Sequence, residues 1–146
     1  MRRYTATSLD APGRLFQVTQ VSSSHSQLWL QSDRAPEIGF QYRLEVYFPW
    51  VSYYCGPFAI RGLALRQADP GRRDRLAEHH GLGIDPKYGL YLLSPDHDWF
   101  VVAGSPSWAE AALGYNAPSV FWSSEDRSDV IISIGQLQKS PEATEA

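Results

Sequence analysis

The chain has 146 residues, of which 43% are apolar and 20% charged, with a formal net charge of −3. This length and composition are typical of one globular domain that buries its own core. The acidity lies in the last third, where residues 101–146 carry two basic and six acidic side chains. Since nucleic-acid binding depends on a basic surface, and acidic neighbours offset the cluster Arg72, Arg73 and Arg75, we expect no nucleic-acid partner.

The cysteine content and the lack of long apolar runs indicate in which cellular compartment the protein works. Cys55 is the only cysteine, so no intrachain disulfide can form, as is usual in a reducing compartment. The basic N-terminus lacks the apolar stretch of a signal peptide, and no apolar run approaches the ~20 residues that span a bilayer. We therefore expect a cytoplasmic protein without a membrane partner. The scarcity of lysine, with high alanine and glycine usage, favours a bacterial source.

The first third of the chain has the patterns of β-strands. Residues 15–21 and 27–31 flank a polar turn and predict a hairpin. Residues 40–48 alternate, which predicts a strand with one buried face and one face in water. The expected buried face contains Phe40, Tyr42, Leu44, Val46 and Phe48, and the expected wet face contains Gln41, Arg43 and Glu45.

Three further strand regions follow. In residues 57–66 the apolar positions change from even to odd at Gly62, which predicts a β-bulge there. Residues 90–93 and 99–103 predict a second hairpin whose strands are buried on both faces. Residues 130–134 predict a last strand.

Two short helices are also expected. Asp69 suits the N-cap, Pro70 the first helical position and Gly81 the end of a helix over about residues 70–80, mostly in water. Ser107 and Glu110 have the spacing of a capping box, which predicts a second helix ending near Gly114.

These elements predict an α+β fold: a single domain over residues 1–138, dominated by an antiparallel sheet, with one or two short helices. Strands follow one another in hairpin-like pairs, with few helices for parallel crossovers. The sheet is expected to be either one strongly curved sheet or two packed sheets. Residues 139–146 are polar and without pattern, and predict a disordered tail.

An excess of aromatic side chains, 13% of the residues, is the most distinctive feature. In the dense run of residues 47–54, the rings either form a large core under a two-layer sheet or, because Pro49 interrupts the strand, lie in a connection that presents them to a partner or a pocket. A second group of aromatic and acidic residues suits a basic partner or, alternatively, is a sheet edge followed by a solvated turn. The binding residues predicted from these two groups are Tyr47, Trp50, Tyr53, Tyr54, Phe121, Trp122, Glu125 and Asp126.

No motif of a nucleotide-binding loop, a zinc protease or a serine hydrolase occurs, and we predict no cofactor and no metal site. Asp96-His97-Asp98 resembles a metal-binding group in composition, yet adjacent residues rarely face one ion and a polar hairpin tip explains them. His79 and His80 suit a helix C-terminus. Cys55 has no histidine near it in the sequence that could act as its base, although any of the four histidines could approach it in the fold.

Three functions follow as hypotheses. The first is a non-enzymatic protein-interaction domain, in the form, for example, of a bacterial immunity or antitoxin-like protein. Its partner would be a protein, and the acidic last third of the chain suits a basic one. The second is a small-molecule binding module with an aromatic-lined pocket that includes Trp99. The third is a small enzyme using Cys55, or Asp96 and Asp98 with a histidine, which requires these groups to converge in a cleft. The sequence gives no oligomeric state.

Overall fold

The computed structural model describes residues 1–22, 26–114, 117–121 and 128–138. Ten strands, one α-helix and a 3-10 turn (Pro36–Ile38) are assigned there. The strands are β1 (Arg2–Ala6), β2 (Ser8–Ser22), β3 (Gln27–Ser32), β4 (Arg43–Phe48), β5 (Tyr53–Cys55), β6 (Ala59–Gln67), β7 (Gly89–Leu92), β8 (Phe100–Ala103), β9 (Ser107–Ala111) and β10 (Ile131–Leu137), and the helix is α1 (Pro70–His80).

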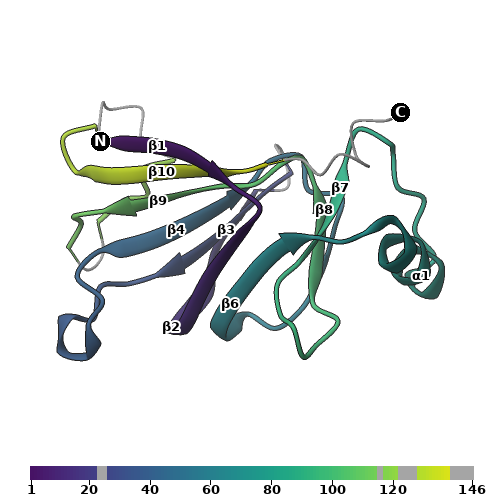
Figure 1. The fold of residues 1–146 in the computed structure, drawn as a ribbon, viewed down its shortest axis with the longest axis horizontal. Helices are drawn as coiled ribbons and strands as arrows, with labels where there is room; N and C mark the ends of the chain where they lie inside the picture. The colour runs from purple at the N-terminus through teal and green to yellow at the C-terminus, as the bar shows by residue number, and fades with distance from the viewer. Residues whose placement is uncertain (23–25, 115–116, 122–127, 139–146) are drawn as a thin grey trace.

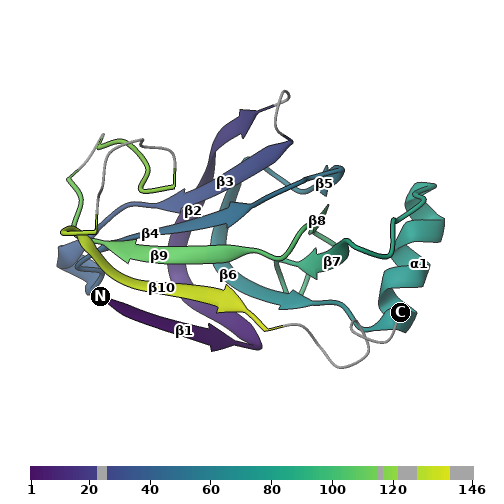
Figure 2. The same cartoon turned by 90° about the horizontal axis from the view of Figure 1, so that it is seen from above.

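The strands are hydrogen-bonded in the order β1-β10-β9-β4-β3-β2-β6-β7-β8-β5. Within the described part of the chain, β1 and β10 form the parallel pair and the other pairs are antiparallel. β1 and β5 are the two edges, so the sheet is not closed (Figures 1 and 2). The prediction of a fold dominated by an antiparallel sheet is confirmed. In the described ranges no helix has the length and apolarity needed to cross a bilayer.

Both predicted hairpins are confirmed, as β2–β3 and β7–β8. Every residue of β7 and β8 is buried, as predicted for strands covered on both faces. On one face, Leu90, Leu92 and Phe100 pack in a cluster with Leu76 of α1. The other face contributes to the larger core, so the β7–β8 hairpin separates two apolar clusters.

Helix α1 forms where the sequence predicted it. The Asp69 carboxylate accepts a hydrogen bond from the backbone N–H of Arg72 at 2.9 Å, and Gly81 ends the helix in the left-handed conformation. Leu76 is the buried residue of α1, which explains why the helix lies at the margin of the molecule in Figure 1.

The second predicted helix is wrong: residues Ser107–Ala111 form the strand β9. Its backbone pairs with β4 on one side and with β10 on the other. Trp108 and Ala109 point to opposite faces, and both are buried. Pairing on both sides gives this backbone hydrogen-bond partners at both of its edges, an advantage that the local capping-box spacing does not offer.

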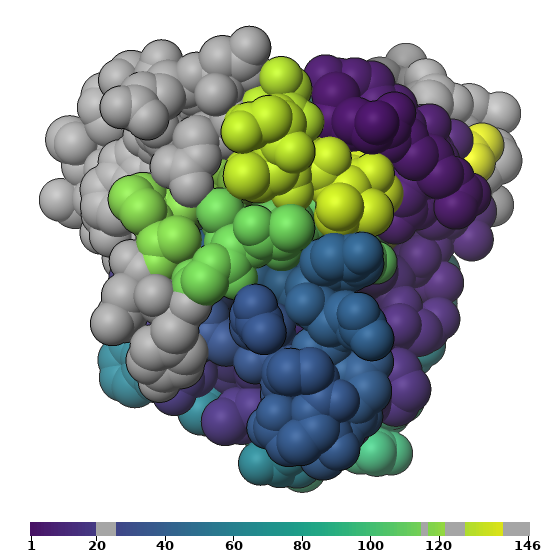
Figure 3. Space-filling model, turned by 90° about the vertical axis from the view of Figure 1, so that its left-hand side faces the viewer, coloured from purple at the N-terminus to yellow at the C-terminus, as the bar shows by residue number. Residues whose placement is uncertain are grey.

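Strand β1, which the sequence did not predict, completes one edge. The Trp108 indole N–H donates to the Tyr4 hydroxyl at 2.7 Å, and the two rings make an edge contact with centroids 6.2 Å apart. Figure 3 shows β1 beside β10 at the surface. Trp108 therefore links β9 to β1 across β10.

Candidate functional site

The connection between β4 and β5 presents Trp50 to solvent. Its side chain is 63% exposed, and its backbone has φ = 52°, a conformation that is rare for a bulky residue. The neighbouring backbone is held on both sides: Gly104 N–H donates to the Pro49 carbonyl at 2.8 Å, and Val51 N–H to the Ser26 carbonyl at 2.6 Å. The exposed Trp50 side chain is thus carried by a backbone that hydrogen bonds hold on both sides.

The other aromatic residues of this run diverge. Phe48 is fully buried in the larger core. Tyr53 stacks on Phe100 at 5.6 Å, and its hydroxyl lies 3.1 Å from His80 Nδ1. Tyr54 packs against the larger core and donates to the Pro57 carbonyl at 2.5 Å. These rings therefore do not form one shared patch or pocket.

Two of the predicted binding residues do meet. The rings of Tyr47 and Phe121 are stacked, with centroids 5.4 Å apart, and Tyr47 also contacts Trp29 at 5.2 Å. The Gln27 amide donates to the Tyr47 hydroxyl at 2.8 Å. Trp122, Glu125 and Asp126 lie outside the described residues.

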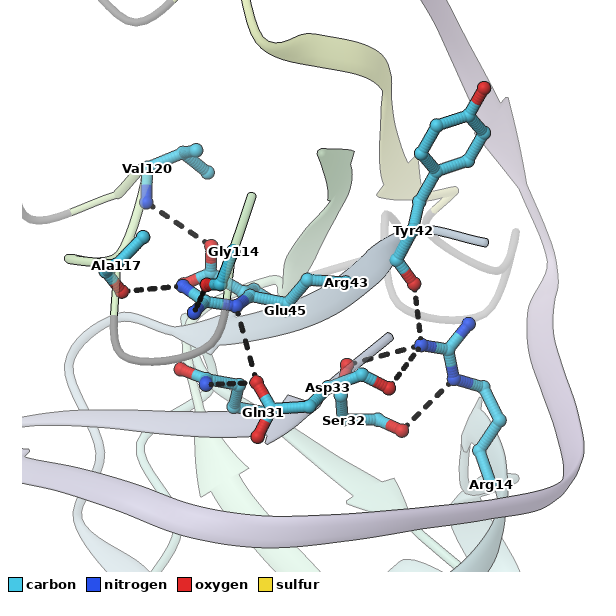
Figure 4. A network of polar contacts seen from close by, with 10 residues as sticks. All are labelled: Arg14, Gln31, Ser32, Asp33, Tyr42, Arg43, Glu45, Gly114, Ala117 and Val120. Carbon is cyan, nitrogen blue, oxygen red and sulfur yellow. Dashed lines mark hydrogen bonds and ion pairs between the residues drawn. The ribbon is translucent and has the colours of Figure 1, made fainter. Parts of the chain in front are cut away.

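The expected wet face of residues 40–48 is wrong for Arg43 and Glu45, each only 1% exposed. Gly114, Ala117 and Val120, here called the covering segment, lie over them (Figure 4). Arg43 donates to the carbonyls of Ala117 at 2.7 Å and Gly114 at 2.9 Å, and its Nε lies 3.4 Å from Asp33 Oδ1. The backbone polar groups of the covering segment thus satisfy the side chains that alternation alone assigns to water.

Arg14 belongs to the same network of buried polar side chains as Arg43 and Glu45 (Figure 4). Its guanidinium donates to the Ser32 hydroxyl at 2.9 Å and to the Tyr42 carbonyl at 2.7 Å (Figure 4). Burial lowers the pKa of Arg14, while the charges of Glu110 and Asp33 oppose that shift. Because Arg14, Arg43 and Glu45 are buried and hydrogen-bonded to other parts of the chain, this network holds the fold together.

The Asp96-His97-Asp98 tip divides between two surfaces. Asp98 turns to α1, where it accepts a hydrogen bond from Arg72 Nη2 at 3.0 Å. The His97 ring stacks on Trp99 with centroids 4.2 Å apart and planes 14° apart. In the described ranges, no group of three or more histidine, cysteine, aspartate or glutamate side chains is placed to hold a metal ion.

His97 and Trp99 line an open groove of about 520 Å³, and Asp10, Arg61 and Asp96 are also part of its lining. The groove lies between the β2–β6 pair and the connection of the β7–β8 hairpin. Its walls combine a stacked ring pair, two carboxylates and one guanidinium with apolar side chains such as Leu63. Such a lining can bind a group that is flat or cationic.

The groove is shaped by the β-bulge that the sequence predicted at Gly62. Ala11 pairs with Leu63 and Leu15 with Arg61, so three β2 residues lie opposite Gly62 alone. Gly62 and Gly13 both have φ near +77°, a conformation that glycine adopts without strain. The phase change on β6 is confirmed, but the extra residues belong to β2.

Cys55 does not form a nucleophile–base pair among the described residues. It is partly buried and packs against the apolar cluster under α1. His80 contacts Tyr53, and His97 contacts Trp99. His25 lies outside the described residues.

Comparison of the chain with protein families, with curated proteins and with solved structures gave no match. The candidate site therefore depends on the geometry of the groove.

Sequence reasoning did not identify Asp10 and Arg61 as site residues. The two signals nearest to them, the phase change at Gly62 and the polar group around His97, are 35 positions apart in the chain. They meet because β6 pairs with β2 on one side and with β7 on the other. That pairing order is the information that a single sequence does not carry.

Proposed function

We propose that this protein is a non-enzymatic interaction domain whose groove binds a basic segment of a partner protein. The observation that carries the proposal is the grouping of Asp10 and Asp96 with the stacked rings of His97 and Trp99 in one groove. A cation over an aromatic face gains electrostatic attraction, and a nearby carboxylate adds to it.

The composition of the groove favours binding over catalysis. Asp96 N–H donates to the Ser94 hydroxyl, so the loop carrying Asp96 is itself ordered. His97 is stacked on a ring, and among the described residues no hydrogen bond joins it to a carboxylate or a nucleophile. The bulge opposite Gly62 would add local curvature to the sheet, as in the predicted alternative of one strongly curved sheet. That curvature would leave room for a chain segment.

Site-specific photo-crosslinking tests this proposal. A photoreactive residue at Ala64, which lines the groove, is expected to capture one protein in the source cells through a segment containing arginine or lysine. The same residue at Gln136, exposed on β10, is expected to capture none. Asp10→Asn with Asp96→Asn should abolish capture, whereas Asp74→Asn with Glu78→Gln, which alters charge equally on α1, should not. Capture that persists without the two groove carboxylates would contradict the proposal.

The groove volume favours small-molecule binding as a second candidate, because small-ligand pockets span roughly 300–1,000 Å³. Native mass spectrometry of the purified protein separates the two. A bound metabolite lost in the Asp10→Asn, Asp96→Asn variant, with no crosslinked protein, would replace the first proposal by the second.

A further inference from the structure

A second open cavity, of about 480 Å³, lies between α1 and the Asp98 side of the 94–98 loop. It is lined by Arg72, Arg75, Leu76, His79 and Asp98. Residues three and four apart share one face of a helix, which explains why Arg72, Arg75 and His79 meet here. The cavity is distinct from the groove, which has none of these five residues in its lining.

The charges of this cavity are unequal. Asp98 supplies one carboxylate, and it binds Arg72 at 3.0 Å. The Arg75 side chain is exposed and makes no ion pair within the described ranges. The lining thus contains two arginines and one histidine for a single carboxylate, and the Arg75 guanidinium is available to an incoming anion.

The ion pair of Asp98 indicates which chemistry the cavity accepts. The Arg72 guanidinium already binds a carboxylate oxygen, that of Asp98. The Asp98 side chain is 69% exposed, so this ion pair lies in contact with water. An exposed ion pair contributes little to stability, so an incoming oxyanion can displace this carboxylate at small cost. Guanidinium groups bind phosphate oxygens in pairs, and two such groups suit a doubly charged anion better than a carboxylate.

We infer that the cavity is a binding site for the phosphate group of a small molecule. Arg72 and Arg75 bind its oxygens, His79 lines the remaining side, and Asp98 moves away from Arg72 when the phosphate binds. This inference does not depend on the proposed partner of the groove.

Nuclear magnetic resonance of the arginine Nε–Hε groups during titration with inorganic phosphate tests the inference. Saturable shifts are expected for Arg72 and Arg75, and acetate should produce much weaker ones. The Arg72→Gln, Arg75→Gln variant should lose the binding. Arg73→Gln, which removes one positive charge from the same helix outside the cavity lining, should retain it.

The variant Asp98→Asn gives the sharper result. Removing the competing carboxylate should tighten phosphate binding about two- to fivefold, the contribution expected of an exposed ion pair. Asp74→Asn changes the net charge equally on the exposed surface of α1, away from the cavity, and should have little effect. Equal tightening in both variants, an equal loss in Arg73→Gln, or an absence of saturable shifts would overturn the inference.

Discussion

Arg43 and Glu45 lie on the same face of β4, and both bind the main chain of one covering segment. Arg43 donates to the carbonyls of Gly114 and Ala117, and Glu45 accepts the N–H of Val120 at 3.2 Å. Two opposite charges of one strand thus hold three residues of the covering segment, Gly114, Ala117 and Val120. The stack of Tyr47 on Phe121 adds an apolar contact beside them.

Arg43→Ala should lower the free energy of unfolding by about 3–5 kcal/mol, because it removes the charged donor of the Gly114 and Ala117 carbonyls and the ion-pair partner of Asp33. Urea denaturation measures this loss. Arg66→Ala, on an exposed position of β6, should change stability by less than about 0.5 kcal/mol. Similar losses in the two variants would show that Arg43 is not buried under the segment.

Gly135→Ala should destabilise the protein by about 1–3 kcal/mol through overpacking. A Cβ at Gly135 would lie 2.2 Å from the Trp108 Nε1 atom, so the indole would have to move away from Tyr4. A Cβ at Gly83 would have no atom within 4 Å, which makes Gly83→Ala the control. Thermal unfolding followed by near-ultraviolet circular dichroism measures both stability and the Trp108 environment. An unchanged spectrum in Gly135→Ala would contradict the close packing of β10 on Trp108.

Trp50→Gly should be more stable than Trp50→Ala by about 1 kcal/mol, although alanine is ordinarily the more favourable residue. The reason is the left-handed backbone at Trp50, which glycine adopts without a steric penalty. Chemical denaturation of the two variants measures the difference. If Trp50→Ala proved the more stable, the backbone there would not be left-handed.

Tyr54 should make the stability pH-dependent at alkaline pH. Burial, and to a smaller extent the neighbouring charge of Cys55, raises the pKa of Tyr54 from 10.0 to about 12. Between these values the unfolded chain loses the phenolic proton and the folded protein keeps it, so stability falls as the pH rises. Tyr54→Phe should cost about 1 kcal/mol at neutral pH, because the bond to Pro57 is lost.

The same variant provides the test, since it cannot ionise. The difference in unfolding free energy between the native protein and Tyr54→Phe should shrink between about pH 8 and about pH 11. Tyr91, whose pKa burial also raises, is present in both proteins and cancels in the comparison. A constant difference over this range would show that the Tyr54 hydroxyl ionises normally.

The sequence by itself determined the features that depend on near neighbours. The ends of α1 follow from Asp69, Pro70 and Gly81, because a helix cap is a contact within one turn. Hairpins β2–β3 and β7–β8 follow from two apolar runs and a polar turn, and the bulge opposite Gly62 from a change of phase.

The tertiary structure decided everything that depends on distant partners. Ser107–Ala111 is a strand because β4 and β10 offer partners on both sides, and Arg43 and Glu45 are buried because the covering segment lies over them. The alternation of apolar and polar residues in a strand shows that its two faces differ. Whether another segment covers the polar face depends on contacts between residues 70 or more positions apart, such as Arg43 and Gly114. For the same reason the aromatic side chains of residues 47–54 lie in different places, some in each of the two apolar clusters and Trp50 in solvent. Asp10, Arg61 and His97, in contrast, come together in one groove.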